Sequence, residues 1–372
     1  MSKLTKYKFS DLYEISSGIS SSKEQAGHGS PFISFSTVFN NYFLPEELPD
    51  LMDTSLKEQE IFSVKKDDVF ITRTSETVDA LAMSCVAVKE YPKATFSGFV
   101  KRLRPKTTGI VYSKYIAFFL RSKYFRKVLD CNTIMTLRAS FNEDMFSFLY
   151  LYLPDYEEQV RIGDLLYKME MKIRTNNKIN DNLSAMAYDI YMHNFFSKKP
   201  NAKLKDILTE AEKSAIQVGE AKTSNGKYPF FTSGATILKW NEPFVDGRNC
   251  FLNTGGNADI KFYVGKAAYS TDTWSISAKS KMSDYLYLML FSIKPELDQK
   301  FFQGTGLKHL QKPLLKDRPI YVPEKLELEA FNRQVMPMFD IISENTRENQ
   351  QLTSLRDWLL PMLMNGQATI SD

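Results

Sequence analysis

The strongest constraint on the fold is that the chain contains two copies of one pattern. Leu151-Tyr152-Leu153-Pro154 recurs as Ile320-Tyr321-Val322-Pro323, 169 positions further on. The segments behind these prolines keep the same offset at four positions: Ile173, Asn176, Asn180 and Leu183 match Ile342, Asn345, Asn349 and Leu352. The two copies also begin alike, at Lys8-Phe9-Ser10-Asp11-Leu12 and at Lys203-Leu204-Lys205-Asp206-Ile207. A repeat of this length is too long for a solenoid and indicates that a whole domain was duplicated together with a following helix.

The length and composition fit two globular domains with connecting elements. The chain has 372 residues, of which 43% are hydrophobic and 25% are charged, so it can bury two cores of ordinary size. We therefore expect an α+β protein in which two globular domains alternate with two long helices. The expected segments are a first domain over 1–155, a first helix over 156–199, a second domain over 200–323, and a second helix with the C-terminal segment over 324–372.

The segment behind each shared proline has the spacing of a coiled-coil helix. From Glu157 to Phe196 there is no proline, and apolar or asparagine residues recur every three or four positions. The seam residues are Leu166, Met169, Ile173, Asn176, Asn180 and Leu183 in the first copy, and Met338, Ile342, Asn345, Asn349 and Leu352 in the second. In the second copy we expect a kink or a late start at Pro337 and an end at Pro361.

Two asparagines occupy matched seam positions in both copies. Asparagine in a seam usually fixes the register and orientation of the helices at a cost in stability. If the two helices pack antiparallel, Asn176 faces Asn349 and Asn180 faces Asn345. The alternative is that these side chains turn towards solvent.

Short apolar runs in each domain predict strands, and two of these strands end in comparable polar segments. The predicted strands lie at 69–71, 85–88, 99–100, 250–252, 262–264 and 274–276. Ile71-Thr72-Arg73-Thr74-Ser75 compares with Leu252-Asn253-Thr254-Gly255-Gly256-Asn257. Arginine and asparagine suit bidentate recognition of guanine and adenine edges, and threonine and serine suit phosphate contacts. The candidate DNA contacts are therefore Arg73, Thr74, Ser75, Asn253, Thr254 and Asn257; the alternative is that these residues only cap turns.

Two further segments offer basic side chains. From Lys89 to Lys127 there are 11 basic residues and one acid, Glu90, and we take Lys101 and Arg102 as candidate DNA contacts. The alternative for this stretch is a solvated helix face beside an ordinary basic strand. In the segment from Gly304 to Leu310, which corresponds to 132–138 in the first copy, Lys308 and His309 could reach a phosphate. The alternative is a tight turn that leads into a buried segment.

Motifs of catalysis are missing from the sequence. Gly226-Lys227 and Gly265-Lys266 lack the first glycine of a phosphate-binding loop, and neither GxSxG nor HExxH occurs. The three histidines are scattered, and the adenine-methyltransferase motif of Asn or Asp before Pro-Pro and an aromatic residue is absent. These absences make catalysis by this chain improbable. We also expect a cytoplasmic protein without a membrane span, because the three cysteines are far apart and no signal peptide precedes the first domain.

Several motifs resemble the specificity subunit of type I restriction–modification systems. Pro154 followed by Glu157-Glu158-Gln159-Val160-Arg161-Ile162 is similar to the start of that family's first conserved helix. Leu355-Arg356-Asp357-Trp358-Leu359-Leu360-Pro361-Met362-Leu363-Met364-Asn365-Gly366-Gln367 resembles its C-terminal end. The segments at 73–75 and 304–310 resemble features of its target recognition domains. The second helix departs from the pattern, because Pro323-Glu324-Lys325-Leu326-Glu327 lacks the glutamine.

The resemblance implies a protein that supplies specificity and no chemistry. Each globular domain would recognise one half of a split, double-stranded DNA target, and the two helices would pack as an antiparallel coiled coil about a pseudo-twofold axis. Two methyltransferase subunits would bind S-adenosylmethionine, and separate restriction and translocase subunits would use ATP and Mg²⁺, so this chain would hold no cofactor or metal. A helix of about 30 to 40 residues spans roughly 45 to 60 Å, enough to serve domains that meet DNA about one turn, or 34 Å, apart.

Two other functions stay open at this point. The chain could be a scaffold that binds partner proteins without recognising bases, which predicts little dependence of DNA affinity on salt. It could also be a self-contained methyltransferase with a divergent cofactor site, which the missing motifs disfavour.

Overall fold

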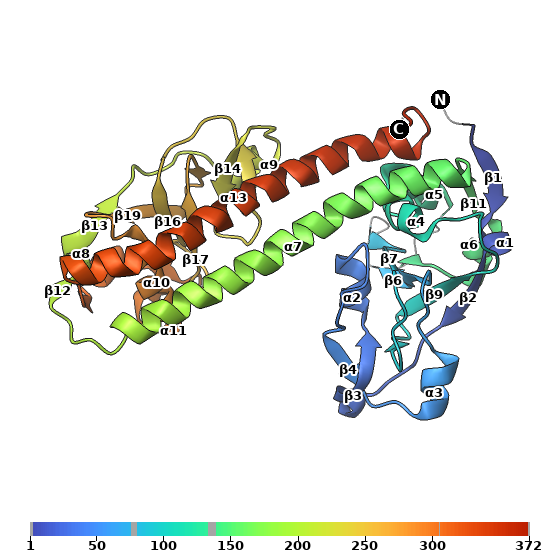
Figure 1. Cartoon of the computed structure of the whole chain (residues 1–372), viewed down its shortest axis with the longest axis horizontal. Coiled ribbons are helices and arrows are strands. Elements are labelled where there is room, and N and C mark those ends of the chain that lie inside the picture. The colour runs from blue at the N-terminus through green and yellow to red at the C-terminus, as the bar shows by residue number, and fades with distance from the viewer. Residues whose placement is uncertain (1–2, 76–79, 133–138, 305, 371–372) are drawn as a thin grey trace. The chain divides into compact units, whose positions relative to one another are not determined.

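The chain folds into two compact units, the first of which combines two segments distant in sequence (Figure 1). The computed structural model describes residues 3–75, 80–132, 139–304 and 306–370. Unit 1 comprises Met1–Met171 and Leu352–Asp372, and unit 2 comprises Lys172–Gln351. Both long helices therefore contribute to both units: α7 covers Tyr156–Phe195 and α13 covers Lys325–Met364, 40 residues each.

Unit 1 is built on an antiparallel sheet in the order β2-β9-β5-β7, whose strands are Tyr13–Ser17, Val100–Pro105, Val69–Thr72 and Ser84–Val86. A second sheet, β4-β3-β8, consists of Asp50–Met52, Ala26–Ile33 and Thr95–Phe96. Two strand pairs complete the β structure: β1 with β11 (Thr5–Lys8, Tyr150–Leu153) and β6 with β10 (Thr74–Ser75, Ala139–Ser140). The short helices are α1 Phe9–Leu12, α2 Phe35–Asn40, α3 Leu56–Ile61, α4 Ser113–Phe119, α5 Lys123–Asn132, α6 Glu143–Phe148 and the 3₁₀ turn Lys23–Gln25.

Unit 2 repeats this plan. Its main sheet has the order β13-β19-β16-β17, with strands Leu208–Glu210, Thr273–Ala278, Arg248–Asn253 and Ile260–Val264. The second sheet, β15-β14-β18, consists of Leu238–Trp240, Tyr228–Phe231 and Ala268–Tyr269. The strand pairs are β12 with β22 (Ala202–Lys203, Pro319–Ile320) and β20 with β21 (Phe302–Gln303, His309–Leu310). The helices are α8 Leu204–Ile207, α9 Val218–Lys222, α10 Ser283–Ser292, α11 Lys294–Glu296, α12 Lys312–Lys316 and the π-helical turn Leu297–Phe301.

The two units have the same strand order, which confirms the duplication inferred from sequence. In each, the four-stranded sheet is antiparallel throughout, and the three-stranded sheet contains one parallel pair, β3 with β8 or β14 with β18. The strands predicted at 69–71, 85–88, 250–252, 262–264 and 274–276 correspond to β5, β7, β16, β17 and β19. The strand predicted at 99–100 begins one residue later, at Val100.

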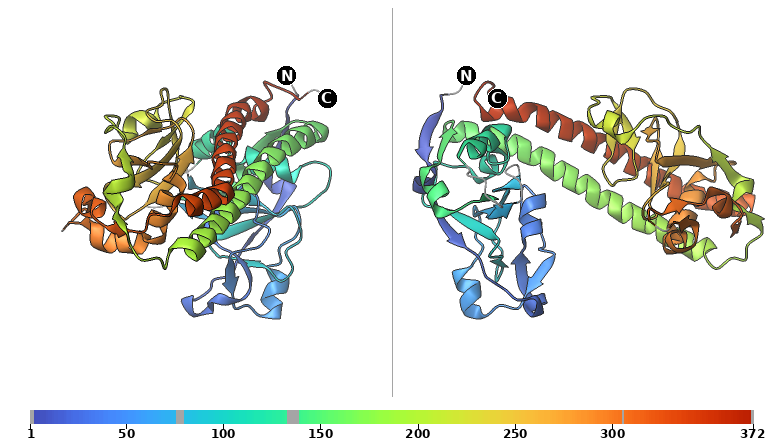
Figure 2. Two further views of the ribbon diagram at one scale, coloured as in Figure 1. Left: turned by 60° about the vertical axis from the view of Figure 1, so that its left-hand side comes forward. Right: turned by 180° about the vertical axis from the view of Figure 1, so that it is seen from behind.

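Each unit closes its core with the N-terminal part of one long helix and the C-terminal part of the other. In unit 1, Ile162 and Leu166 from α7 join Leu363 and Met364 from α13 in one buried cluster. The residues that do this in unit 2 are Ala187, Tyr191 and Phe195 from α7, and Leu328, Phe331, Val335 and Phe339 from α13. Within unit 2 the two helices lie side by side, as both further views show (Figure 2).

The start of α7 is tied to unit 1 by the residues that carry the family motif. The backbone N–H of Glu158 donates to Asp155 Oδ1 at 2.9 Å, which caps the helix. Gln159 is buried; its Nε2 donates to the carbonyl oxygens of Pro154 and Ile110, and its Oε1 accepts from the N–H of Tyr112. The second copy has no such glutamine because the matching position, Leu328, is packed in the core of unit 2 instead.

The structure corrects two expectations for the prolines in α13, the late start at Pro337 and the end at Pro361, while the kink at Pro337 stays a prediction. The helix starts at Lys325, before Pro337, so the late start is wrong, and it continues past Pro361 to Met364. A proline in a helix removes one hydrogen bond at a cost of about 3 kcal/mol. Buried contacts on either side offset this cost: Val335 and Phe339 flank Pro337, and Leu363 and Met364 follow Pro361.

The seam residues pack much as predicted. Leu166 is buried and Met169 packs against the same core, while Met338 and Ile342 pack against the core of unit 2. Ile173, Leu183 and Leu352 are half-buried.

The asparagine pairing expected for antiparallel helices is confirmed. Asn176 is fully buried, and its Nδ2 donates to Asn349 Oδ1 at 2.9 Å and to Glu348 Oε2 at 2.7 Å. Asn345 Nδ2 donates to Asn180 Oδ1 at 2.8 Å. Because the partner's number falls as the number in α7 rises, the helices run antiparallel in unit 2.

We expect Asn180 and Asn345 to be energetically coupled. Alanine at each position removes the same hydrogen bond, so the loss in the double variant should be smaller than the sum of the single losses by about 0.5–1.5 kcal/mol. Alanine's greater helix propensity cancels in this comparison. Urea unfolding of the purified chain measures the coupling. Ile179→Ala, an exposed neighbour on α7, is the control, and purely additive losses would contradict the pairing.

A buried ion pair fastens the sheet of unit 2 to α13. Arg248, the first residue of β16, donates to Asp284 at 2.7 and 2.8 Å, to Asp340 of α13 at 2.6 Å and to the carbonyl oxygen of Met336. The Asp284 side chain is fully buried. Burial raises the pKa of Asp284, while Arg248 acts in the opposite direction.

Arg248→Ala should destabilise unit 2 by about 3 kcal/mol near neutral pH, because it leaves a buried carboxylate unpaired. Without Arg248 the folded-state pKa of Asp284 rises further above its unfolded value. The loss in unfolding free energy should therefore be largest above the folded-state pKa of Asp284 in the variant. It should shrink as the pH falls and Asp284 takes up a proton. Unfolding at neutral pH and at about pH 5 tests this. Arg333→Ala, exposed on α13, is the control, and a loss independent of pH would contradict the account.

Candidate nucleic-acid interface

The central strands of both units end at equivalent loops, which are held by equivalent backbone hydrogen bonds. In unit 1 the N–H of Arg73 donates to the carbonyl oxygen of Phe99 at 2.8 Å, and the N–H of Phe141 donates to that of Arg73 at 2.8 Å. In unit 2 the N–H of Thr254 donates to the carbonyl oxygen of Asp272 at 2.9 Å, and the N–H of Leu310 donates to the carbonyl oxygen of Thr254 at 3.0 Å. The structure thus places Arg73 and Thr254 at the same point of the fold, as the sequence comparison predicted. It also adds a second matched pair, Phe99 and Asp272.

The side chains at the unit 1 loop are partly exposed. Arg73 is exposed, and its Nη1 lies 3.5 Å from the carbonyl oxygen of Gly98. Thr74 and Ser75 are half-buried in β6, which pairs with β10. Phe99 is 64% exposed, although the other strand-forming aromatic nearby, Phe96, is fully buried. Arg73 and Phe99 therefore present a cation and an aromatic ring at one edge of unit 1.

Lys101 and Arg102 lie inside unit 1. Lys101 is 7% exposed and donates from Nζ to Ser17 Oγ at 2.7 Å, and its burial lowers its pKa. Arg102 is 9% exposed, donates to the carbonyl oxygen of Ser63 at 2.6 Å and stacks over Phe96. Both side chains hold β9 to its neighbours, so we leave them out of the interface proposed below.

Other members of the basic stretch are also used internally. Arg104 forms an ion pair with buried Asp68 at 2.7 Å, and Arg121 donates to the carbonyl oxygens of Ser84 and Val38 at 2.7 Å each. Lys114 pairs with Asp164 of α7 at 2.8 Å. The sequence could not separate such internal arginines from a surface patch, because charge density alone does not report burial.

The unit 2 loop is shaped by Asn253. This residue is 4% exposed; its Nδ2 donates to the carbonyl oxygens of Gly255 and Asn257, and its Oδ1 accepts from the N–H of Asp259. Asn253 therefore caps its own turn, which was the alternative interpretation of this residue. Thr254 is half-buried and Asn257 is exposed, so these two have side chains near the surface.

Lys308 and His309 lie beside that loop. His309 is exposed and bridges to Gly255 through the backbone. Lys308 Nζ forms an ion pair with Asp298 Oδ2 at 2.9 Å, which helps to lower the pKa of Asp298. Thr305 of the predicted segment lies outside the described residues, and so do residues 133–138 of the matching segment in unit 1.

A cleft of about 420 Å³ opens next to Thr254 in unit 2. Thr254, Asp272, Trp274 and His309 are among the residues that line it. Trp274 Nε1 donates to Glu210 Oε2 at 2.9 Å, and the Nζ of Lys312 lies 4.9 Å from the centre of the Trp274 ring. Sequence reasoning missed Asp272 and Trp274 because the loop before β19 shares only a serine, Ser270, with Ser97 of the matching loop in unit 1.

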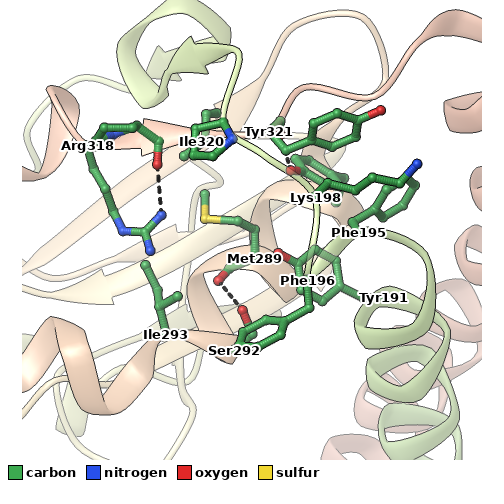
Figure 3. Close-up of a pocket in the computed structure, with 13 residues that line it drawn as sticks. Tyr191, Phe195, Phe196, Lys198, Met289, Ser292, Ile293, Arg318, Ile320 and Tyr321 are labelled. Carbon is green, nitrogen blue, oxygen red and sulfur yellow. Dashed lines mark hydrogen bonds between the residues drawn. The ribbon is translucent and has the colours of Figure 1, made fainter.

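A smaller pocket of about 120 Å³ lies where the end of α7 meets α10 and β22 (Figure 3). Tyr191, Phe195, Tyr285 and Met289 are among the residues that line it, and the Tyr285 ring packs against the rings of Tyr191 and Phe195. Ser292 Oγ donates to the carbonyl oxygen of Met289 at 2.8 Å. The pocket belongs to the packing that holds α7 in unit 2.

The described part of the chain shows neither a metal-binding cluster nor a membrane-spanning helix. Among those residues no three histidine, cysteine, aspartate or glutamate side chains gather closely enough to hold a metal ion. No helix within the same ranges combines the length and apolar character needed to cross a membrane.

The family model of the type I restriction modification DNA specificity domain matches residues 1–185 and again residues 198–353. These two stretches coincide with the two copies and cover most of the chain. The chain belongs to the family of type I restriction–modification specificity subunits. It is 20% identical to the MjaIX specificity subunit of Methanocaldococcus jannaschii, over 98% of this chain and 93% of that protein. It is 22% identical to the HindI specificity subunit of Haemophilus influenzae, over 90% of this chain and 94% of that protein.

The fold is shared with a solved specificity subunit. The crystal structure of the type I S subunit from M. genitalium matches with a TM-score of 0.65 and 14% identity, covering 97% of this chain and 96% of that one. The architecture expected from the sequence is thus found in a member of the same family.

Proposed function

We propose that this specificity subunit is the non-catalytic DNA-recognition subunit of its complex, and that each unit recognises one part of a bipartite, gapped target in double-stranded DNA. The observation that carries the proposal is the matched pair of loops. Their backbones are held alike, but Arg73 and Phe99 in unit 1 are replaced by Thr254 and Asp272 in unit 2. Two loops with equivalent backbones and different side chains suit two half-sites of different sequence.

The proposed contacts follow from the chemistry of these side chains. Arg73 is exposed and can donate two hydrogen bonds to a guanine edge. Thr74, Ser75, Thr254, Asn257, Lys308 and His309 are proposed as contacts to phosphates or bases. The formal net charge of +4 is modest for a DNA-binding protein, which favours an assembly in which partners share the grip on DNA.

Methylation and cleavage are assigned to other subunits. We propose that two methyltransferase subunits dock on the long helices and bind S-adenosylmethionine, and that restriction and translocase subunits use ATP and Mg²⁺. This chain would then need no cofactor of its own. A scaffold without base recognition is the competing function.

The direct test is to map modified adenines across a genome by single-molecule sequencing, with the methyltransferase subunit expressed with or without this chain. We expect a gapped two-part motif that disappears when this chain is omitted. The same motif without this chain would contradict the proposal and favour the scaffold. A complex that forms and shows no salt-dependent DNA binding would do the same.

The length of the gap should depend on the long helices. Adding one turn to both α7 and α13 lengthens each by about 5.4 Å, which corresponds to between one and two base pairs. We expect the gap of unread base pairs between the two half-sites to widen by that amount, while the sequences of both half-sites stay the same. The methylome of the variant measures this, and an unchanged gap would show that the helices do not set the spacing.

A further inference from the structure

The loop before β9 holds an exposed aromatic ring on a backbone that is fixed on both sides. The N–H of Ser97 donates to the carbonyl oxygen of Ile33 at 3.0 Å, and the N–H of Gly98 donates to the carbonyl oxygen of Ile19 at 2.7 Å. Phe99 N–H donates to Ser97 Oγ at 3.2 Å, and its carbonyl oxygen accepts from Arg73. A Cβ at position 98 would lie 3.0 Å from the carbonyl oxygen of Ile19, a tight contact that glycine avoids. The ring is thus presented to solvent by a rigid turn.

The ring shares its edge of unit 1 with the Arg73 guanidinium. Arg73 N–H lies 2.8 Å from the oxygen of Phe99, and Arg73 Nη1 lies 3.5 Å from that of Gly98, so the guanidinium extends along the same turn. In the major groove, arginine suits the O6 and N7 atoms of guanine, and an apolar side chain suits the methyl group of thymine. A cation and a ring carried by two residues whose backbones are hydrogen-bonded to each other therefore suit two neighbouring bases of these types.

Unit 2 offers a different chemistry at the same place. Asp272 occupies the position of Phe99, as the shared hydrogen bonds of the two loops show. A carboxylate accepts from the amino group of cytosine and gains nothing from a methyl group. Phe99 in unit 1 thus suits the methyl group of thymine, whereas Asp272 in unit 2 suits the amino group of cytosine.

We propose that Phe99 is a specificity-determining residue that contacts the 5-methyl group of a thymine, next to a guanine contacted by Arg73, in the half-site recognised by unit 1. This inference rests on the proposed function, and it adds the base and the atom that the ring recognises.

The test uses the assembled methyltransferase complex and its mapped target. Each thymine of either half-site is replaced in turn by uracil, which removes only the methyl group. For the wild-type complex we expect one replacement to weaken binding about fourfold, as the loss of one buried methyl group implies. Phe99→Ala should bind the thymine and uracil targets equally. Arg73→Ala should lose about tenfold or more in discrimination at the neighbouring guanine.

Phe148→Ala is the matched control, because Phe148 is 58% exposed at the end of α6 in the same unit. It should retain the fourfold difference. The inference is overturned if no uracil replacement weakens wild-type binding, if Phe99→Ala keeps the difference, or if Phe99→Ala prevents assembly and so marks Phe99 as a protein contact. A wild-type complex without any gapped motif would instead remove the proposed function, and this inference with it.

Discussion

Neither unit can close its hydrophobic core without both long helices. Ile162 and Leu166 of α7 meet Leu363 and Met364 of α13 in the core of unit 1, and the opposite ends of the same helices complete unit 2. The helices are therefore structural parts of the recognition units and not linkers between them. A change in their length or register is transmitted to the units directly, because the buried residues that would have to move are the same ones that hold each unit together.

Polar contacts give this packing its specificity. Apolar seams tolerate sliding, whereas buried amides must find partners, so the Asn176–Asn349 and Asn180–Asn345 pairs favour one register. The two units are then fastened to their helices by different means. Unit 1 uses the hydrogen bonds of Gln159, and unit 2 uses Arg248 with Asp284 and Asp340. The fold was thus preserved after the duplication while individual contacts were replaced.

The sequence predicted the features that depend on repetition and periodicity. The helix seam and the asparagine pairing follow from spacing, and six of the eight strands of the two four-stranded sheets follow from apolar runs. The correspondence of Arg73 with Thr254 follows from aligning strand ends. The burial of Lys101 and Arg102 could not be predicted, because long basic side chains appear in strands on either face. Asn253 looked like a base contact but caps its own turn, a role that depends on carbonyl groups up to four residues away. Phe99 and Asp272 were missed because their loops share almost no sequence.

The central claim is that each unit recognises its own half of the target. The most direct measurement exchanges residues 200–323 for the second domain of another specificity subunit, keeps α7 and α13 unchanged, and maps the methylated motif of the hybrid complex. The account predicts that one half-site changes, while the other half-site and the length of the gap are retained. A motif in which both halves change, or in which neither does, would contradict it.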